Sequence, residues 1–315
     1  MRAYCFDRYR LALPPGHRFP VSKYRLLRER LEGHPGLVLI EAPAASDGEL
    51  ALAHTPQYVG AVVEGHLQPA QLREIGFPWS PEMVERARRS VGATIAAARS
   101  ALSDGVAANL AGGTHHASAD KGSGYCVFND TAVAARLMQA EWHRRHPATR
   151  GSLLRIAVID LDVHQGNGTA AIFRDDDTVF TLSMHGASNF PFRKEAGDLD
   201  VALPDGCRDE QYLDALDLAL VELWRRHRDA LPGLIFYLAG ADPHEDDRLG
   251  RLKLSAAGLA ERDRRVFEQA RTRGIPVVVS MAGGYGRVIE KTVEVQVATI
   301  EAACRSCRQW NNRAA

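Results

Sequence analysis

Cysteine is scarce in this sequence, and the few cysteines form no pattern. They are Cys5, Cys126, Cys207, Cys304 and Cys307. An odd, scattered set of this kind argues against the disulfide framework of a small secreted protein. Cys304 and Cys307 are spaced like a thiol pair, but no second pair completes a zinc site, so the sequence assigns them no role. We expect the chain to end in a polar tail over about residues 305–315.

The sequence also lacks long hydrophobic runs and an excess of charge of either sign. The longest apolar runs, such as Leu234 to Ala239 and Pro276 to Ala282, are far too short to cross a bilayer. No basic stretch followed by an apolar one opens the chain, so we expect a cytoplasmic protein. Lysine plus arginine and aspartate plus glutamate both number 39, so the net charge predicts neither a nucleic-acid nor a membrane partner.

No repeat, linker or change of composition divides the chain, so we expect a single domain over residues 1–315. Short apolar segments predict strands at Leu37 to Ile40, Ile156 to Ile159, Val179 to Leu182, Leu234 to Leu238 and Val277 to Ser280. Longer periodic segments predict helices at Ser80 to Gly105, Asp130 to His146, Asp209 to His227, Ser255 to Arg273 and Val288 to Arg308. This alternation predicts an α/β fold with a mostly parallel central sheet and helices on both faces.

Acidic and imidazole side chains follow the predicted strand at Ile156 to Ile159. Asp160, Asp162 and His164 are two residues apart, so on an extended segment they point to the same side. Such a set favours a metal ion, although acidic residues after a strand can also simply cap the next helix. Asp242 follows another predicted strand, and the carboxyl ends of parallel strands meet at one edge. Asp242 is therefore the candidate that would complete a metal site.

Two further segments carry groups suited to acid–base chemistry. His115 and His116 follow glycines, and in a loop both imidazoles can face a cleft and serve metal-assisted hydrolysis as base and acid. The alternative is a pair of surface or hydrogen-bonded histidines. Tyr285 lies among glycines, which favours a mobile loop over core packing. Its hydroxyl could donate to the oxyanion that forms when water attacks an amide.

Four motifs together resemble the histone deacetylase family in identity, order and spacing. They are Gly112-Gly113-Thr114-His115-His116-Ala117 with Gly124-Tyr125-Cys126-Val127-Phe128-Asn129-Asp130, then Asp160-Leu161-Asp162-Val163-His164-Gln165-Gly166-Asn167-Gly168, Gly240-Ala241-Asp242 and Gly283-Gly284-Tyr285. The resemblance extends from about Gly16 to Tyr285. Gln165 and Asn167 stand where class I members carry a histidine and an aspartate, so the chain looks most like bacterial relatives of class IV.

The resemblance implies an enzyme that uses a metal-activated water to hydrolyse the amide of an acylated lysine or a similar amine. The family's metal ligands fall on Asp162, His164 and Asp242. This set implies Zn²⁺, with Fe²⁺ as a competitor in the cell because the ligands are rich in oxygen.

The resemblance also assigns roles to other residues. The implied catalytic residues are His116 as general base and acid, His115 as electrostatic support, Tyr285 for the oxyanion, Asp160 to hold His115 and Asn167 to orient His116. The implied walls of a substrate tunnel are Tyr125, Phe190, Leu249 and Gly124. The implied ligands of a structural K⁺ are Asp160, Asp162, His164, Ser183 and Met184.

Three other functions were compared with this interpretation: two other kinds of enzyme and one binding protein. Arginase-like ureohydrolases share the architecture, but the residues around Gly166 and Pro243 lack the ligands for their second metal. A non-enzymatic acyl-lysine binding protein would be expected to have lost a base, a ligand or the tyrosine. An acetylpolyamine amidohydrolase would carry an acidic gatekeeper where this chain has Leu249. The acyl chain, the natural substrate and the oligomeric state stay open.

Overall fold

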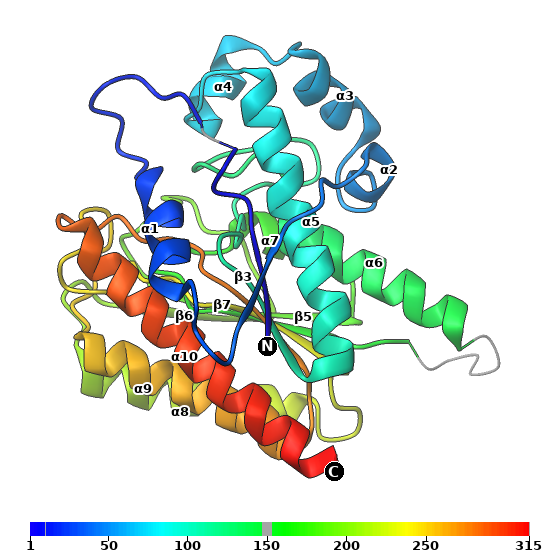
Figure 1. Cartoon of the computed structure of the whole chain (residues 1–315), viewed down its shortest axis with the longest axis vertical. Helices are drawn as coiled ribbons and strands as arrows, with labels where there is room; N and C mark the ends of the chain where they lie inside the picture. The colour runs from blue at the N-terminus through cyan, green and yellow to red at the C-terminus, as the bar shows by residue number, and fades with distance from the viewer. Residues whose placement is uncertain (10, 147–152, 315) are drawn as a thin grey trace.

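The computed structural model describes residues 1–9, 11–146 and 153–314 as one α/β domain built around a single sheet (Figure 1). The strands are β1 (Arg2–Cys5), β2 (Val38–Glu41), β3 (Val106–Asn109), β4 (Ile156–Asp160), β5 (Val179–Gly186), β6 (Leu199–Leu203), β7 (Leu234–Leu238) and β8 (Val277–Ser280). The helices are α1 (Ser22–Leu31), α2 (Asp47–Leu50), α3 (Pro56–Glu64), α4 (Pro69–Ile75), α5 (Pro81–Asp104), α6 (Asp130–Arg145), α7 (Asn167–Phe173), α8 (Asp209–Arg226), α9 (Ala256–Arg273) and α10 (Ile289–Ala314).

The eight strands lie in the order β2-β1-β3-β8-β7-β4-β5-β6, and each pair of neighbours is parallel. The predicted α/β fold is therefore confirmed, and the sheet is more uniformly parallel than expected. Helices α1, α8, α9 and α10 pack on one face, and α5 and α6 lie on the other (Figure 1). The four central neighbours β3, β8, β7 and β4 are the strands whose carboxyl ends lead into the sequence motifs.

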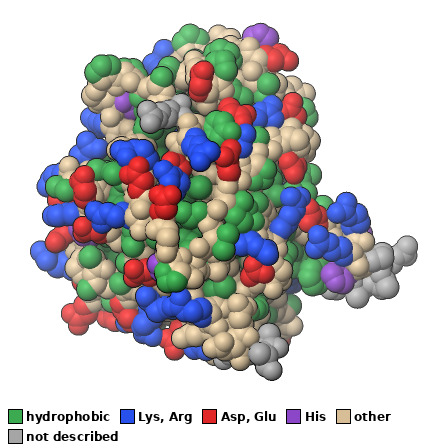
Figure 2. Space-filling view, in the orientation of Figure 1, with side chains coloured by type: hydrophobic (Ala, Val, Ile, Leu, Met, Phe, Trp, Pro, Cys, Tyr) green, Lys and Arg blue, Asp and Glu red, His purple; other side chains and the backbone are tan. Residues whose placement is uncertain are grey.

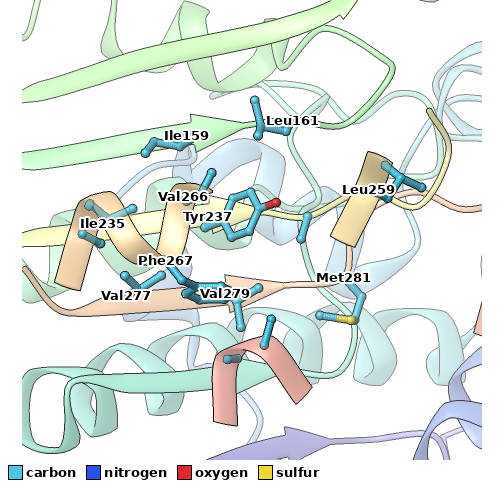
Figure 3. Packing of buried hydrophobic residues seen from close by; sticks show 14 of the residues in the cluster. Ile159, Leu161, Ile235, Tyr237, Leu259, Val266, Phe267, Val277, Val279 and Met281 are labelled. Carbon is cyan, nitrogen blue, oxygen red and sulfur yellow. The ribbon is translucent and has the colours of Figure 1, made fainter. Parts of the chain in front are cut away.

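Strand β7 shows how the core is divided between the two faces. Ile235 and Tyr237 belong to the cluster beneath α9 and α10 (Figure 3), whereas Leu234, Phe236 and Leu238 belong to the cluster beneath α5. All five side chains are buried. A strand that is covered on both faces needs a continuous apolar run, so the sequence here shows no polar alternation.

The strongest helix prediction is also confirmed. Helix α5 begins at Pro81, after Ser80 accepts a hydrogen bond from the amide of Met83 at 3.1 Å. It ends at Gly105, whose φ of +82° is in the left-handed region that glycine adopts without strain. Strands β1, β3 and β6 were not predicted, because their residues carry weaker strand signals. β3 is only Val-Ala-Ala-Asn, and its alanines lack the branched side chains that indicate a strand.

The polar tail expected over about residues 305–315 is wrong for the part that the structure describes, because α10 continues as one helix to Ala314. Cys304, Ser306 and Cys307 form a buried stripe where the tail was expected to begin, whereas Arg308, Gln309, Asn311 and Asn312 are exposed. A side-chain carbon at Gly105 would lie 2.2 Å from the ring of Trp310, so this end of the helix packs closely against the end of α5. The exposed face of an amphipathic helix was mistaken for a tail.

Charged side chains of both signs are interspersed over the face shown in Figure 2. This agrees with the equal numbers of basic and acidic residues. Among the described residues, no helix combines the length and the apolar character needed to cross a membrane.

Candidate active site

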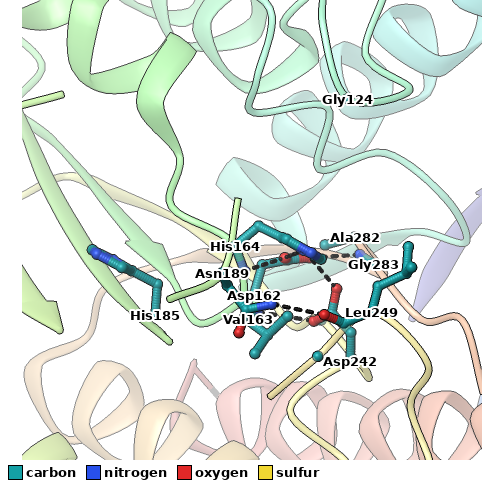
Figure 4. A network of polar contacts seen from close by, with 12 residues as sticks. Gly124, Asp162, Val163, His164, His185, Asn189, Asp242, Leu249, Ala282 and Gly283 are labelled. Carbon is teal, nitrogen blue, oxygen red and sulfur yellow. Dashed lines mark hydrogen bonds and ion pairs between the residues drawn. The ribbon is translucent and has the colours of Figure 1, made fainter. Parts of the chain in front are cut away.

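Three side chains that come from the ends of two neighbouring strands converge in a buried cluster. Asp162 and His164 follow β4, and Asp242 follows β7. Each side chain has one potential metal-ligand atom, and these three atoms all lie within 4.8 Å of one another. The Nδ1 atom of His164 is 3.0 Å from Asp162 Oδ1 and 3.2 Å from Asp242 Oδ2 (Figure 4). The structure thus brings together the three residues that the sequence indicates as metal ligands.

The cluster fits a divalent cation by its chemistry and by its surroundings. Asp242 Oδ1 accepts a hydrogen bond from the amide of Val163 at 2.9 Å. Its Oδ2 is buried and lies 3.2 Å from Nδ1 of His164, another of the three candidate ligands. Buried carboxylate oxygens are normally paired or bound to a metal. A side-chain carbon at Gly283 would lie 1.8 Å from this oxygen, so only glycine lets the loop after β8 close over the cluster.

The two carboxylates of the cluster repel each other, and both attract the imidazole of His164. Burial and the charge of Asp162 raise the pKa of Asp242 to about 7. Burial alone would lower the pKa of His164, but hydrogen bonds to the two carboxylates raise it to about 10. A proton on His164 therefore lies between the carboxylates, where a metal ion would supply the positive charge instead.

The two adjacent histidines are buried and have different partners. His115 Nδ1 lies 2.6 Å from Asp160 Oδ2, and His116 Nδ1 lies 2.7 Å from Asn167 Oδ1. An amide oxygen can only accept, so Nδ1 of His116 must carry the proton. The neutral His116 ring then has its lone pair on Nε2. The predicted pairings of Asp160 with His115 and of Asn167 with His116 are both present in the structure.

These partners set opposite pKa shifts for the two imidazoles. Burial, followed by the charges of His115 and His164, lowers the pKa of His116 well below its usual range. Burial would also lower the pKa of His115, but the charges of Asp160 and Asp162 raise it to about 9. These opposite shifts of pKa favour the neutral form of His116 and the protonated form of His115.

Tyr285 lies in the loop that follows β8, beside the same cluster. Its amide donates to Asp247 Oδ2 at 2.6 Å, and its carbonyl accepts from Arg248 Nε at 2.9 Å. Its ring lies edge-on to His164 with the ring centroids 6.3 Å apart. Burial and the charges of Asp162 and Asp242 raise the pKa of Tyr285 well above its ordinary value, so the hydroxyl keeps its proton and can donate it.

The four residues predicted to form a tunnel line one pocket together with His116, His164 and Tyr285. They are Gly124, Tyr125, Phe190 and Leu249. Phe190 meets His116 edge-on, with the ring centroids 4.9 Å apart. A side-chain carbon at Gly124 would lie 2.6 Å from the His116 ring, so glycine keeps this wall close to the imidazole.

The residues predicted to hold a monovalent ion lie at the junction of β4 and β5. Asp160 pairs with Ser183 across the two strands, and Met184 is the next residue on β5. Ser183 Oγ lies 3.0 Å from Nδ1 of His185.

Several buried residues that support the site were missed by the sequence analysis. Asp130 accepts hydrogen bonds from the amides of Gly113 and Thr114 and so holds the loop that leads to the histidine pair. Asp247 holds Tyr285 as described above. The ammonium of Lys23 donates to the carbonyl of Ala282 at 3.2 Å, across 259 positions of sequence. Asp130 lies within a recognised motif, but no spacing in the sequence points to Lys23.

Comparisons with known proteins agree with this geometry. A family model described as histone deacetylase domain matches residues 17–300. The chain is 44% identical over 288 residues to an uncharacterised protein of Picosynechococcus sp., covering 90% of this chain and 92% of that protein. It is 33% identical over 270 residues to histone deacetylase 2 of Arabidopsis thaliana, covering 81% of this chain and 66% of that protein. A solved HDAC homolog from Aquifex aeolicus matches with a TM-score of 0.78 at 25% identity, over 96% of this chain and 83% of that chain.

Proposed function

Because the chain belongs to the histone deacetylase family, we propose that it is a metal-dependent deacylase that hydrolyses the amide of acylated lysine or of a closely related amine. One observation carries the proposal. Asp162, His164, His115, His116 and Tyr285 line one pocket with aromatic walls, and Asp242 lies against His164 behind it. Nucleophile activation, proton transfer and oxyanion stabilisation are the three tasks of amide hydrolysis, and each has a group here.

The three cluster residues would hold the metal. A divalent ion at this position would polarise the amide carbonyl and make a water molecule more acidic. Two carboxylates and one imidazole match Zn²⁺ and also Fe²⁺, so we propose Zn²⁺ with Fe²⁺ as an alternative in the cell. The junction of β4 and β5 would hold a structural K⁺ through Asp160, Asp162, His164, Ser183 and Met184.

His116 would move the proton. Its Nε2 carries a lone pair because Nδ1 donates to Asn167, and its lowered pKa keeps the ring neutral before the reaction. Nε2 can take a proton from the attacking water and return it to the nitrogen of the leaving amine. His115, held by Asp160, would supply positive charge beside the developing oxyanion rather than act as the base.

Tyr285 would donate its hydroxyl proton in a hydrogen bond to the oxyanion as the carbonyl carbon becomes tetrahedral. The raised pKa of the phenol keeps this donor protonated. Tyr125 and Phe190 would flank the aliphatic stem of the substrate and exclude water around it. From Gln165 and Asn167 we also propose that the chain is related to the class IV members of the family.

A comparison of two substrates tests the proposal. We expect a higher kcat/KM for an acetyl-lysine peptide than for N-acetylputrescine, because Leu249 in the pocket wall offers no charge to the free ammonium of N-acetylputrescine. Leu249→Glu should narrow this difference in kcat/KM by attracting that ammonium. The same peptide carrying acyl groups from acetyl to long fatty acyl would define the acyl preference.

Two other results of this comparison would each favour a different function. A wild-type preference for N-acetylputrescine would favour a polyamine amidohydrolase. Binding of the acyl-lysine peptide to the metal-loaded chain without turnover would favour a non-enzymatic binding protein and contradict the proposal.

A further inference from the structure

A buried arginine on helix α9 lies behind the two loops that carry the metal-ligand candidates. Arg262 is fully buried. Its Nη1 atom donates to the carbonyl of Gly240 at 2.6 Å and to the carbonyl of Leu161 at 3.4 Å. Leu161 directly precedes Asp162, and Gly240 lies two residues before Asp242. One guanidinium nitrogen therefore joins the segments that lead into the two carboxylates.

The arginine is itself fixed on the side away from the site. Nε donates to Asp263 Oδ1 at 2.9 Å, and Nη2 lies 2.8 Å from the same oxygen. Asp263 also accepts hydrogen bonds from the hydroxyls of Tyr237 on β7 and Thr299 on α10. The guanidinium is thus held by the sheet and by two helices, and a planar fork held in this way fixes the positions of the carbonyls it binds.

We infer that Arg262 is a positioning residue for the metal centre, which it serves by holding the Leu161 and Gly240 carbonyls and hence the carboxylates of Asp162 and Asp242. This inference rests on the proposed function. Asp263 neutralises the guanidinium, and a bare cation behind the site would repel a divalent ion, so the contribution of Arg262 is geometric.

The effect of Arg262 on the ligand loops can be distinguished experimentally from its contribution to core packing. No backbone hydrogen bond between described residues reaches the carbonyl of Leu161 or that of Gly240, so these two buried carbonyls need a side-chain donor. Thr299 contacts the same Asp263, but its hydroxyl donates only to Asp263 and to the carbonyl of Val295 among the described residues, and neither lies in a ligand loop. Thr299→Val therefore weakens the network without releasing the loops, and serves as the matched control.

Arg262→Lys keeps the charge but loses the fork. We expect the dissociation constant for Zn²⁺, measured by competition with a chelator, to rise about 10–100-fold, the usual effect of losing a group that orients ligands. With Zn²⁺ saturating, kcat for an acetyl-lysine peptide should fall while KM changes little, since Arg262 does not line the pocket. Thr299→Val should lower the urea midpoint of the metal-free chain but leave the Zn²⁺ affinity within about threefold of wild type.

Asp263→Asn gives a second route if Arg262→Lys does not fold, because it loosens the guanidinium and leaves Arg262 in place. It should also weaken Zn²⁺ binding more than Thr299→Val does. Equal loss of affinity in Asp263→Asn and Thr299→Val, or wild-type affinity in a folded Arg262→Lys protein, would overturn the role of Arg262 alone. A wild-type chain that binds no Zn²⁺ would instead overturn the proposed function, and this role with it.

Discussion

Asp242→Ala is expected to abolish stoichiometric metal binding and turnover together. Asp242 is one of only three ligand candidates in the cluster, so its loss leaves two donors, too few to hold a zinc-type ion firmly. The side chain is fully buried, and its Oδ2 lies 3.2 Å from Nδ1 of His164, so the two candidate ligand atoms are close enough to share one cation. Metal content after gel filtration, measured alongside acetyl-lysine hydrolysis, checks both parts of the prediction.

Two controls separate ligation from folding. Asp242→Asn keeps an oxygen that can accept from the amide of Val163, but it removes the charge, so it should also lose the metal while preserving the loop. Asp205→Ala removes an exposed carboxylate paired with Arg251 and should leave metal and rate unchanged. One metal ion per chain in the Asp242→Ala protein would show that the ligands have been assigned wrongly.

Tyr285→Phe is expected to reduce kcat by roughly 10²–10³ while leaving the fold and the metal in place, the usual effect of losing one oxyanion donor. The loop is held by the backbone of Tyr285 through Asp247 and Arg248, and phenylalanine preserves both contacts. The ring can still pack beside His164. Steady-state kinetics on an acetyl-lysine peptide, with metal content measured in parallel, would detect the change.

The matched control is Tyr9→Phe, which removes a hydroxyl that bonds Glu41 at the exposed surface. Its kcat should equal that of the wild type. If kcat of the Tyr285→Phe enzyme stayed within a few-fold of the wild-type value, the hydroxyl of Tyr285 would have no role in stabilising the oxyanion, and the side chain would serve packing alone.

The parts of the fold and of the site that could be predicted are those where an apolar strand pattern is followed directly by residues suited to catalysis or metal binding. β7 and β8 are continuous apolar runs covered on both faces, and each leads directly into a polar motif. Asp162 and His164 were expected on one side of an extended segment; the backbone bends after β4, yet the two side chains still converge as predicted. Asp242 could be added because parallel strands end at a common edge.

The parts that the sequence did not reveal depend on contacts between distant segments. Lys23 reaches Ala282 across 259 positions, and Arg262 reaches Leu161 across 101. Neither residue lies in a motif, and a lysine or an arginine on a helix is usually exposed. The end of α10 was misjudged for a related reason, because its exposed polar face is visible in the sequence while the partner of its buried stripe is not.

The dependence of turnover on a single metal ion can be measured by titration. The chain is stripped of metal, and Zn²⁺ is added stepwise while the release of acetate from an acetyl-lysine peptide is measured; a parallel series uses Fe²⁺ without oxygen. We expect negligible turnover before addition, a linear rise and a plateau at one ion per chain, because the described residues offer one cluster of three ligands. Turnover that is independent of added metal, or a plateau at two ions per chain, would contradict a deacylase with one metal ion held by Asp162, His164 and Asp242.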